Sequence, residues 1–284
     1  GVLLEKIKAE KEQLIKDKKI KKDKDLAPIA EEEIPFEIPE SWEWVRLGEI
    51  GLTQTGTTPS TSVSEYFNGE IPFIKPADIS REGINYNNES LTKKGLEKGR
   101  LIKENSVLMV CIGGSAGKSN YIDRDCSCNQ QINAITGYGN ISAKFIDWFM
   151  NSQEFQVRML SKATGTATPI INKSKWDELL FPLPPLAEQK RIVEKVDKLK
   201  ELINQFREKI QKRDKVRQGL KASIMNEIEK SNSNHDLLEN LELIFRNFDS
   251  VVKTKEDIKD IRDLVLSLAV KGKLVPQDPN DEPA

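Results

Sequence analysis

Residues 182–205 read PLPPLAEQKRIVEKVDKLKELINQ, and this stretch decides the fold. Its prolines Pro184 and Pro185 suit the first turn of a helix, where a missing N–H group costs nothing. Alternating four- and three-residue steps then run from Ile192 to Ile224, and eight of the ten positions are apolar: Ile192, Val196, Leu199, Ile203, Phe206, Ile210, Leu220 and Ile224. This repeat predicts a coiled-coil seam on a helix of about 40 residues, roughly 60 Å long. Such a seam needs a partner.

The residues that follow the long helix offer that partner. Segments 236–249 and 255–271 each carry apolar side chains on one helical face, and Gly272 suits a helix C-terminus. The polar stretch 230–234 permits the chain to reverse. The sequence therefore predicts a long antiparallel coiled-coil helical spacer over residues 183–284.

The N-terminal residues have a different pattern of apolar and charged side chains. Residues 1–24 carry one narrow apolar stripe among lysines and acids, which predicts an amphipathic helix that runs out in the lysine-rich stretch 16–24. An acidic linker follows, and its prolines at 28, 35 and 39 prevent a regular helix. We assign residues 1–34 to this helix and linker, as part of the same helical region as the spacer.

Residues 35–182 form a mixed region. Apolar runs at 44–47, 71–74 and 106–112 read as strands separated by Gly, Asn, Ser and Pro, and one amphipathic helix is expected over 143–161. The fold class is therefore α+β, with one globular mixed α/β domain beside the helical spacer.

Composition bounds the class of protein. The 284 residues are 37% hydrophobic and 31% charged, with a formal net charge of −1, which is typical of a globular protein. No apolar run approaches the length of a membrane span, and the charged N-terminus is no signal peptide, so we expect a cytoplasmic protein without a membrane partner. The three cysteines lack disulfide or zinc spacing, so we expect reduced thiols, no metal and no cofactor.

Positive charge clusters locally. One basic stretch runs from Lys93 to Lys103, and the other lies between Phe155 and Trp176, where no acidic residue occurs. Alone, such runs more often form a solvated face than a nucleic-acid site.

Motifs for catalysis are missing from the sequence. Residues 112–119, IGGSAGKS, lack the glycine that a phosphate-binding P-loop needs five positions before Gly117. The alternatives are a tight turn after a buried strand or a loop whose N–H groups and Lys118 contact a DNA phosphate. No amino-methyltransferase tetrapeptide occurs, and one histidine cannot supply Ser/His/Asp chemistry, so we expect no enzyme.

Several motifs carry a family resemblance. LPPLAEQKRIV at 183–193 closely resembles the signature that ends each target-recognition domain of type I restriction-modification specificity subunits, and IPESWEWVRLGEI at 38–50 looks like the start of such a domain. Between them, motifs appear in the family's order: GTTPS at 56–60, IPFIK at 71–75, Gly117-Lys118, NQQ at 129–131 and Gly165-Thr166. The resemblance covers nearly the whole chain.

The resemblance implies a function. The chain would read double-stranded DNA and direct partner methyltransferase and restriction subunits to a bipartite target, so that DNA methylation and cleavage lie in the partners. The alternative is an assembly adaptor that docks methyltransferase subunits without reading DNA. DNA-reading candidates are the polar and basic residues Thr57, Thr58, Ser60, Lys75, Arg81, Ser115, Lys118, Gln130, Gln131, Thr166, Asn172, Lys173 and Lys175.

Family subunits usually carry two recognition domains, whereas this chain has one. Its last residues, 273–284, resemble the stretch that leads into a helix like the one at Val2, so the chain is either a naturally half-sized subunit or a piece of a longer gene. Its apolar faces exceed what one hairpin would bury. We therefore expect a homodimer that reads an interrupted palindrome.

Overall fold

The computed structural model describes residues 1–22, 24–165, 168–231, 234–274 and 280. The chain divides into two compact units, Gly1–Val196 and Asp197–Ala284. Within the described residues, no helix is both long enough and apolar enough to cross a membrane.

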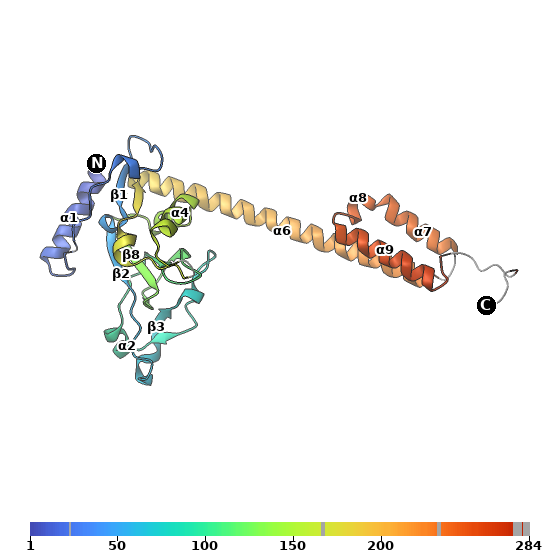
Figure 1. Ribbon diagram of the computed structural model, residues 1–284, viewed down its shortest axis with the longest axis horizontal. Coiled ribbons are helices and arrows are strands. Elements are labelled where there is room, and N and C mark those ends of the chain that lie inside the picture. Colours follow the sequence, from blue (N-terminus) through green and yellow to red (C-terminus); the bar gives the residue numbers. More distant parts are fainter. Residues whose placement is uncertain (23, 166–167, 232–233, 275–279, 281–284) are drawn as a thin grey trace. The chain divides into compact units, whose positions relative to one another are not determined.

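Three small sheets build the first unit (Figure 1). An antiparallel four-stranded sheet has the order β2-β8-β5-β6, a two-stranded sheet pairs β1 with β9, and a three-stranded sheet has the order β4-β3-β7 with β3 and β7 parallel. The strands are β1 (Glu43–Arg46), β2 (Gly51–Thr55), β3 (Phe67–Ile74), β4 (Ser90–Leu91), β5 (Ser106–Val110), β6 (Ser119–Tyr121), β7 (Ser127–Cys128), β8 (Ile132–Gly137) and β9 (Leu180–Leu183). The strands predicted at 44–47, 71–74 and 106–112 correspond to β1, β3 and β5.

The middle strand β5 is buried on both faces. Its alternate side chains serve two apolar cores: Val107 and Met109 pack in one, and Leu108 and Val110 pack in the other. The period of two along a strand explains how one run of apolar residues supplies both cores. The strand that ends at Val110 is therefore a rigid support for the loop that follows it.

The helix predicted over 143–161 is wrong in one respect, because two helices occupy it. These are α3 (Ala143–Met150) and α4 (Gln153–Lys162). The Ser152 hydroxyl accepts a hydrogen bond from the backbone N–H of Phe155 and so caps a new helix. The Asn151 amide donates to the Asp147 carbonyl and ends the previous helix. The remaining helices of the domain, α2 (Lys93–Lys98) and α5 (Lys173–Asp177), are short.

The N-terminal helix α1 (Val2–Lys16) packs against the first unit. Ile7 is fully buried, Glu10 accepts from the backbone N–H of Gly139, and Lys11 donates to the carbonyl of Gly48. The helix ends at the start of the lysine-rich stretch, as predicted.

The linker after α1 is tied to the domain by Arg46. Arg46 is 4% exposed, and its guanidinium donates to both carboxylate oxygens of Glu33 and to the carbonyls of Ala27, Pro28 and Glu178. This bidentate ion pair lowers the pKa of Glu33 from its ordinary value to about 2. One buried arginine thus holds the linker across the domain.

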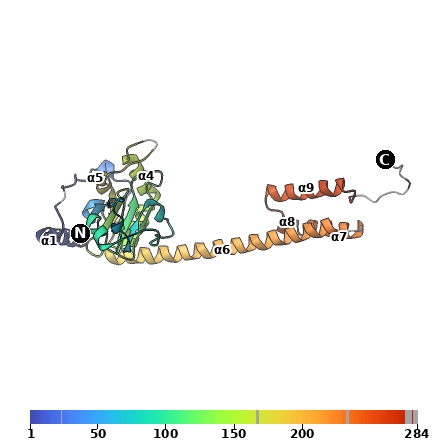
Figure 2. The same ribbon diagram turned by 90° about the horizontal axis from the view of Figure 1, so that it is seen from below.

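The second unit contains the distal part of the long helix α6 (Leu186–Lys230) and the helices α7 (Asn234–Arg246), α8 (Phe248–Val251) and α9 (Lys255–Val270) (Figures 1 and 2). Ile224 and Ile228 of α6 form a small core with residues of the other three helices. The predicted α+β class with a long helical spacer is confirmed. Part of the predicted reversal, residues 232–233, lies outside the described residues.

The hairpin is more elaborate than predicted. Asn240 of α7 bonds to Ser231, and Val251 of α8 accepts from Arg217, so α7 and α8 run antiparallel to α6. Asp257, at the start of α9, bonds to Arg217, whereas Lys273 reaches the Glu229 carbonyl, so α9 runs forward again beside α6. The predicted end at Gly272 is confirmed by its φ of 66°, which glycine adopts at little cost.

Candidate nucleic-acid interface

Four loops meet at one end of the four-stranded sheet. We name residues 56–60, 112–118, 129–131 and 168–172 the loop cluster. Backbone hydrogen bonds join its loops in sequence: Thr57 N–H to the Cys128 carbonyl at 2.9 Å, Cys111 N–H to the Gln131 carbonyl at 2.7 Å, and Gly113 N–H to the Pro169 carbonyl at 3.0 Å. A single surface therefore contains motifs that are far apart in the chain.

Gly56 is required for this assembly. A Cβ atom at position 56 would lie 2.2 Å from the carbonyl oxygen of Asn129 and 2.4 Å from that of Cys128. Any side chain would force loops 56–60 and 129–131 apart. The close approach of the two loops therefore explains why the GTTPS motif begins with glycine.

The NQQ motif divides into two supporting residues and one presented residue. Asn129 accepts from the Gln131 backbone N–H and donates to the Gln131 side chain, which closes a tight turn. Gln130 is exposed, and its side-chain oxygen Oε1 accepts a hydrogen bond from the Thr58 hydroxyl at 2.5 Å. This hydrogen bond orients the Gln130 amide, whose NH₂ group has no acceptor in the part of the chain that the structure describes.

Loop 112–118 is a tight turn with a polar tip. The N–H groups of Ala116 and Gly117 bond to the carbonyls of Gly113 and Val110. Among the described residues, the N–H groups of Gly114 and Ser115 have no acceptor, and Lys118 is exposed without an ion pair. The tight turn is therefore observed, and it leaves two amides and one ammonium group that suit an anion, whereas contact with a DNA phosphate stays a prediction.

Side chains of α3 and α4 hold loop 112–118 in place. Gln156 of α4 donates to the Gly117 carbonyl at 2.8 Å, and Ser119 at the loop's end donates to the buried carboxylate of Asp147 at 2.7 Å. Beneath the cluster, burial raises the pKa of the Cys111 thiol to about 12 and also raises that of Cys128. These cysteines are free and stay protonated at neutral pH, so the support is apolar.

The candidates on α5 have structural partners. Asn172 caps the helix by accepting from the Lys175 N–H, Lys173 pairs with Asp177 at 2.6 Å, and Lys175 donates to the Lys162 carbonyl. Asn172 is the last residue of the loop cluster, and the two lysines border it with their ammonium groups engaged within the protein.

The remaining candidates lie around or beyond the cluster. Lys75 follows Ile74, whose carbonyl accepts from Asn129 N–H, and its ammonium group pairs with Glu89. Arg81 is exposed in a turn that Asn120 ties to β6 through the Ser80 carbonyl. The structure also places Ser60 on loop 56–60 as an exposed residue, whereas Thr166 lies outside the described residues.

One further cation reaches the cluster. Arg100 is exposed and donates to the carbonyl of Thr55, the residue before loop 56–60. It was not among the thirteen candidates, although the basic stretch 93–103 pointed to it. Other members of both basic stretches are paired within the protein: Lys94 with Glu65, Lys103 with Asp125 and Lys162 with Glu178.

Comparisons with known proteins identify the family. The family model described as the type I restriction modification DNA specificity domain matches residues 39–213. The EcoAI specificity subunit of Escherichia coli is 31% identical over 99% of this chain and 49% of its own length, and the EcoEI specificity subunit of the same organism is 31% identical over 99% and 48%. A solved chain from a study of complex assembly and conformational transition of the type I R-M system has a TM-score of 0.51 at 21% identity, covering 61% of this chain and 41% of that one.

This chain belongs to the type I restriction-modification specificity family. It spans about half the length of the curated relatives that it matches. The family resemblance inferred from the motifs is thereby confirmed, and the matched region includes the whole loop cluster.

Proposed function

We propose that this chain is the sequence-specific DNA-recognition subunit of a type I restriction-modification complex. The observation that carries the proposal is the loop cluster, which presents on one surface an exposed ammonium group, an oriented glutamine and two amides that have no acceptor among the described residues. In this proposal residues 35–182 are the recognition domain, residues 1–34 and 183–284 belong to the helical region, and catalysis lies in partner subunits that methylate, translocate and cleave DNA.

The groups of the loop cluster suit two tasks. Lys118 with the amides of Gly114 and Ser115 fits a phosphate, which carries charge but no sequence information. Gln130, held by Thr58, presents amide donors to acceptors on base edges such as guanine O6 and N7. The first group would hold the register and the second would read sequence.

Neutralising the phosphate contact should weaken binding to all DNA alike. In Lys118→Gln, the slope of log K against log salt should become shallower by about one, because one phosphate contact is lost. Gln130→Ala should instead reduce discrimination at one target position by about 1–3 kcal/mol. Salt-dependent gel shifts with target and mutated duplexes, in the presence of methyltransferase subunits, measure both.

A triple variant tests the whole surface. If neutralising Lys118, Lys173 and Lys175 together leaves affinity and salt slope unchanged, the proposed surface is wrong. If the unmodified chain gives no salt-dependent shift of its own while methyltransferase subunits still co-purify with it, the adaptor function replaces DNA reading.

The helical region would dock methyltransferase subunits. The proximal part of α6 carries charged side chains that flank the seam, and most of them are exposed: Glu188, Lys190, Arg191, Glu194, Lys195 and Lys198. The proposal gives these helices the larger share of the docking surface and the recognition domain a smaller one.

A homodimer would bury the apolar residues of the seam that are exposed in the single chain. Leu199, Ile203, Phe206 and Ile210 are 48–53% exposed, although they continue a heptad pattern that is buried at Ile224. An antiparallel pair of α6 helices can set Ile203 opposite Phe206 of the second copy. Because the relatives are about twice as long, a second copy would also supply the second recognition domain.

Charge in the seam should therefore dissociate the dimer. Ile203→Glu or Phe206→Glu should weaken dimerisation at least tenfold per change, since burying a large apolar side chain contributes about 1.5–3 kcal/mol. Sedimentation equilibrium measures the effect, with Glu201→Gln on the outer face as the control.

The DNA target provides an independent check. Two copies related by a two-fold axis read two inverted half-sites separated by a spacer of fixed length. A monomeric chain, or a non-palindromic motif in methylation mapping, contradicts the homodimer.

A further inference from the structure

The lysine segment, residues 16–24, contains six lysines and two aspartates. It directly follows α1, and Ile20 in its middle packs against the core of the first unit. Lys16, Lys18, Lys19, Lys21, Lys22 and Lys24 are exposed. The described residues of the segment, 16–22 and 24, therefore form a basic surface held in place on the unit that carries the loop cluster.

Few of these charges are neutralised within the protein. Lys19 Nζ lies 3.4 Å from Asp17 Oδ2, and both side chains are solvent-accessible, so this ion pair contributes little to stability. Among the described residues, the other five lysines of the segment have no carboxylate partner. This contrasts with the basic stretches 93–103 and 155–176, where most lysines pair internally.

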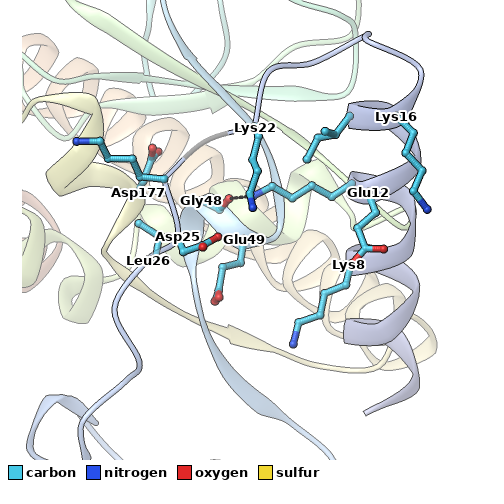
Figure 3. A pocket seen from close by; sticks show the side chains of 12 residues that line it. Lys8, Glu12, Lys16, Lys22, Asp25, Leu26, Gly48, Glu49 and Asp177 are labelled. Atoms are coloured by element: carbon cyan, nitrogen blue, oxygen red, sulfur yellow. Dashed lines mark hydrogen bonds between the residues drawn. The ribbon is translucent and has the colours of Figure 1, made fainter.

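The segment borders a cavity of about 450 Å³ between α1 and the linker with Gly48 and Glu49 (Figure 3). Lys8, Lys16, Lys22 and Lys24 line it, together with Lys11, which is bound to the Gly48 carbonyl. Of the acids that line it, Asp177 pairs with Lys173, and Glu49 accepts from the Arg46 backbone N–H but keeps its charge. The carboxylates of Glu12, Asp25 and Glu49 thus share the recess with five lysines. Lysines from α1 and from the following segment thus share one recess.

The backbone conformation of Lys18 is a second sign that the sequence retains positive charge in this segment. Lys18 adopts a φ of 56° just after α1, in the left-handed position that glycine or asparagine usually takes. A lysine there costs about 1 kcal/mol relative to glycine. The sequence carries a charged side chain where an uncharged glycine would favour the fold.

We propose that the lysine segment, with Lys8, is a second DNA-contact surface that binds the phosphate backbone of double-stranded DNA without reading its sequence. This inference rests on the proposed function and extends it, because it places non-specific binding outside the loop cluster. Blocks of lysine on a fixed surface release counterions from DNA, and each phosphate contact adds about 0.9 to the salt slope.

Charge neutralisation tests the proposal on the full chain. In the variant Lys8→Gln, Lys16→Gln, Lys21→Gln, Lys22→Gln, the salt slope should become shallower by two to four units. Affinity for target and non-target duplexes should fall by the same factor, at least tenfold at about 100 mM salt, and the target preference should persist. Fluorescence anisotropy with a labelled duplex measures slope and affinity, and thermal unfolding checks the fold.

A matched variant separates local from total charge. Lys209→Gln, Lys212→Gln, Lys215→Gln, Lys255→Gln removes four charges from the second unit and should leave the slope unchanged. An unchanged slope in the first variant, or an equal change in both, overturns the proposal. So does loss of methyltransferase co-purification at an unchanged slope, which would make the segment a protein interface. If the unmodified chain lacks target preference, the recognition function fails, while the slope on non-target DNA still tests the lysine segment.

Discussion

Replacing Arg46 with methionine should lower the free energy of unfolding of the first unit by about 3–5 kcal/mol. Methionine keeps much of the volume but removes five hydrogen bonds, so that the carbonyls of Ala27, Pro28 and Glu178 lose their donor. It also leaves the Glu33 carboxylate without its bidentate partner. All four tryptophans lie in the first unit, at positions 42, 44, 148 and 176, so tryptophan fluorescence in urea reports this unit alone.

Lysine at position 46 is the informative control. Arg46→Lys keeps the charge but cannot bond both Glu33 oxygens and three carbonyls, so it should recover only a minor part of the loss. A variant Arg46→Lys as stable as the unmodified protein would show that charge alone holds the linker.

The pH dependence gives a second readout of the same contact. Arg46 lowers the folded-state pKa of Glu33 to about 2, below the ordinary value near 4.3. The stabilisation is therefore complete above about pH 4.5 and is lost as the pH falls toward 2. In Arg46→Met this part of the acid dependence should disappear, and its persistence would contradict the assignment.

The heptad repeat and the strand runs predicted the fold class because periodicity reports directly which side chains are buried. The break between α3 and α4 was not predicted, since apolar residues continue across it. Only the side-chain bonds of Asn151 and Ser152 end one helix and begin the next. Capping depends on rotamers that a hydropathy pattern does not contain.

The candidate site was predicted in part. Motif order brought Thr58, Lys118 and Gln130 onto one list, and hydrogen bonds between loops explain why they meet. The pairing of Lys173 with Asp177 was not predicted, because the basic stretch ends just before that acid. Charge counts over a window identify basic segments, whereas the partner of each ammonium group depends on tertiary contacts.

The lysine segment was predicted only as the place where the N-terminal helix ends, because a lysine run without an apolar period predicts no further structure. The packing of Ile20 and the contacts of α1 hold the segment on the domain, and no pattern in the sequence indicated these contacts.

Replacing Asp257 with asparagine should destabilise the second unit by about 3 kcal/mol. The Asp257 carboxylate is 4% exposed, accepts from Arg217 at 2.8 Å and Lys221 at 2.7 Å, and accepts from the backbone N–H groups of Lys253 and Thr254. Asparagine has nearly the same shape but no charge, so two partly buried cations lose their common partner. Hydrogen exchange of residues 217–228 and 255–268 should accelerate, while tryptophan fluorescence of the first unit stays unchanged.

Asp257 also joins the capping box that starts α9, and the pH dependence separates its two roles. Hydrogen bonds from Lys221 and backbone amides hold the Asp257 pKa far below its ordinary range. Its stabilisation is thus complete above about pH 4 and is lost only as the pH falls well below that value. Asp257→Asn removes the ion pairs but can still accept from the N–H groups at the helix start, whereas Thr254→Ala removes the reciprocal cap and keeps the ion pairs. Thr254→Ala should cost about 1 kcal/mol and keep the acid dependence. Equal losses from the two variants, both with the acid dependence retained, would mean that capping and not charge pairing fixes α9 to α6.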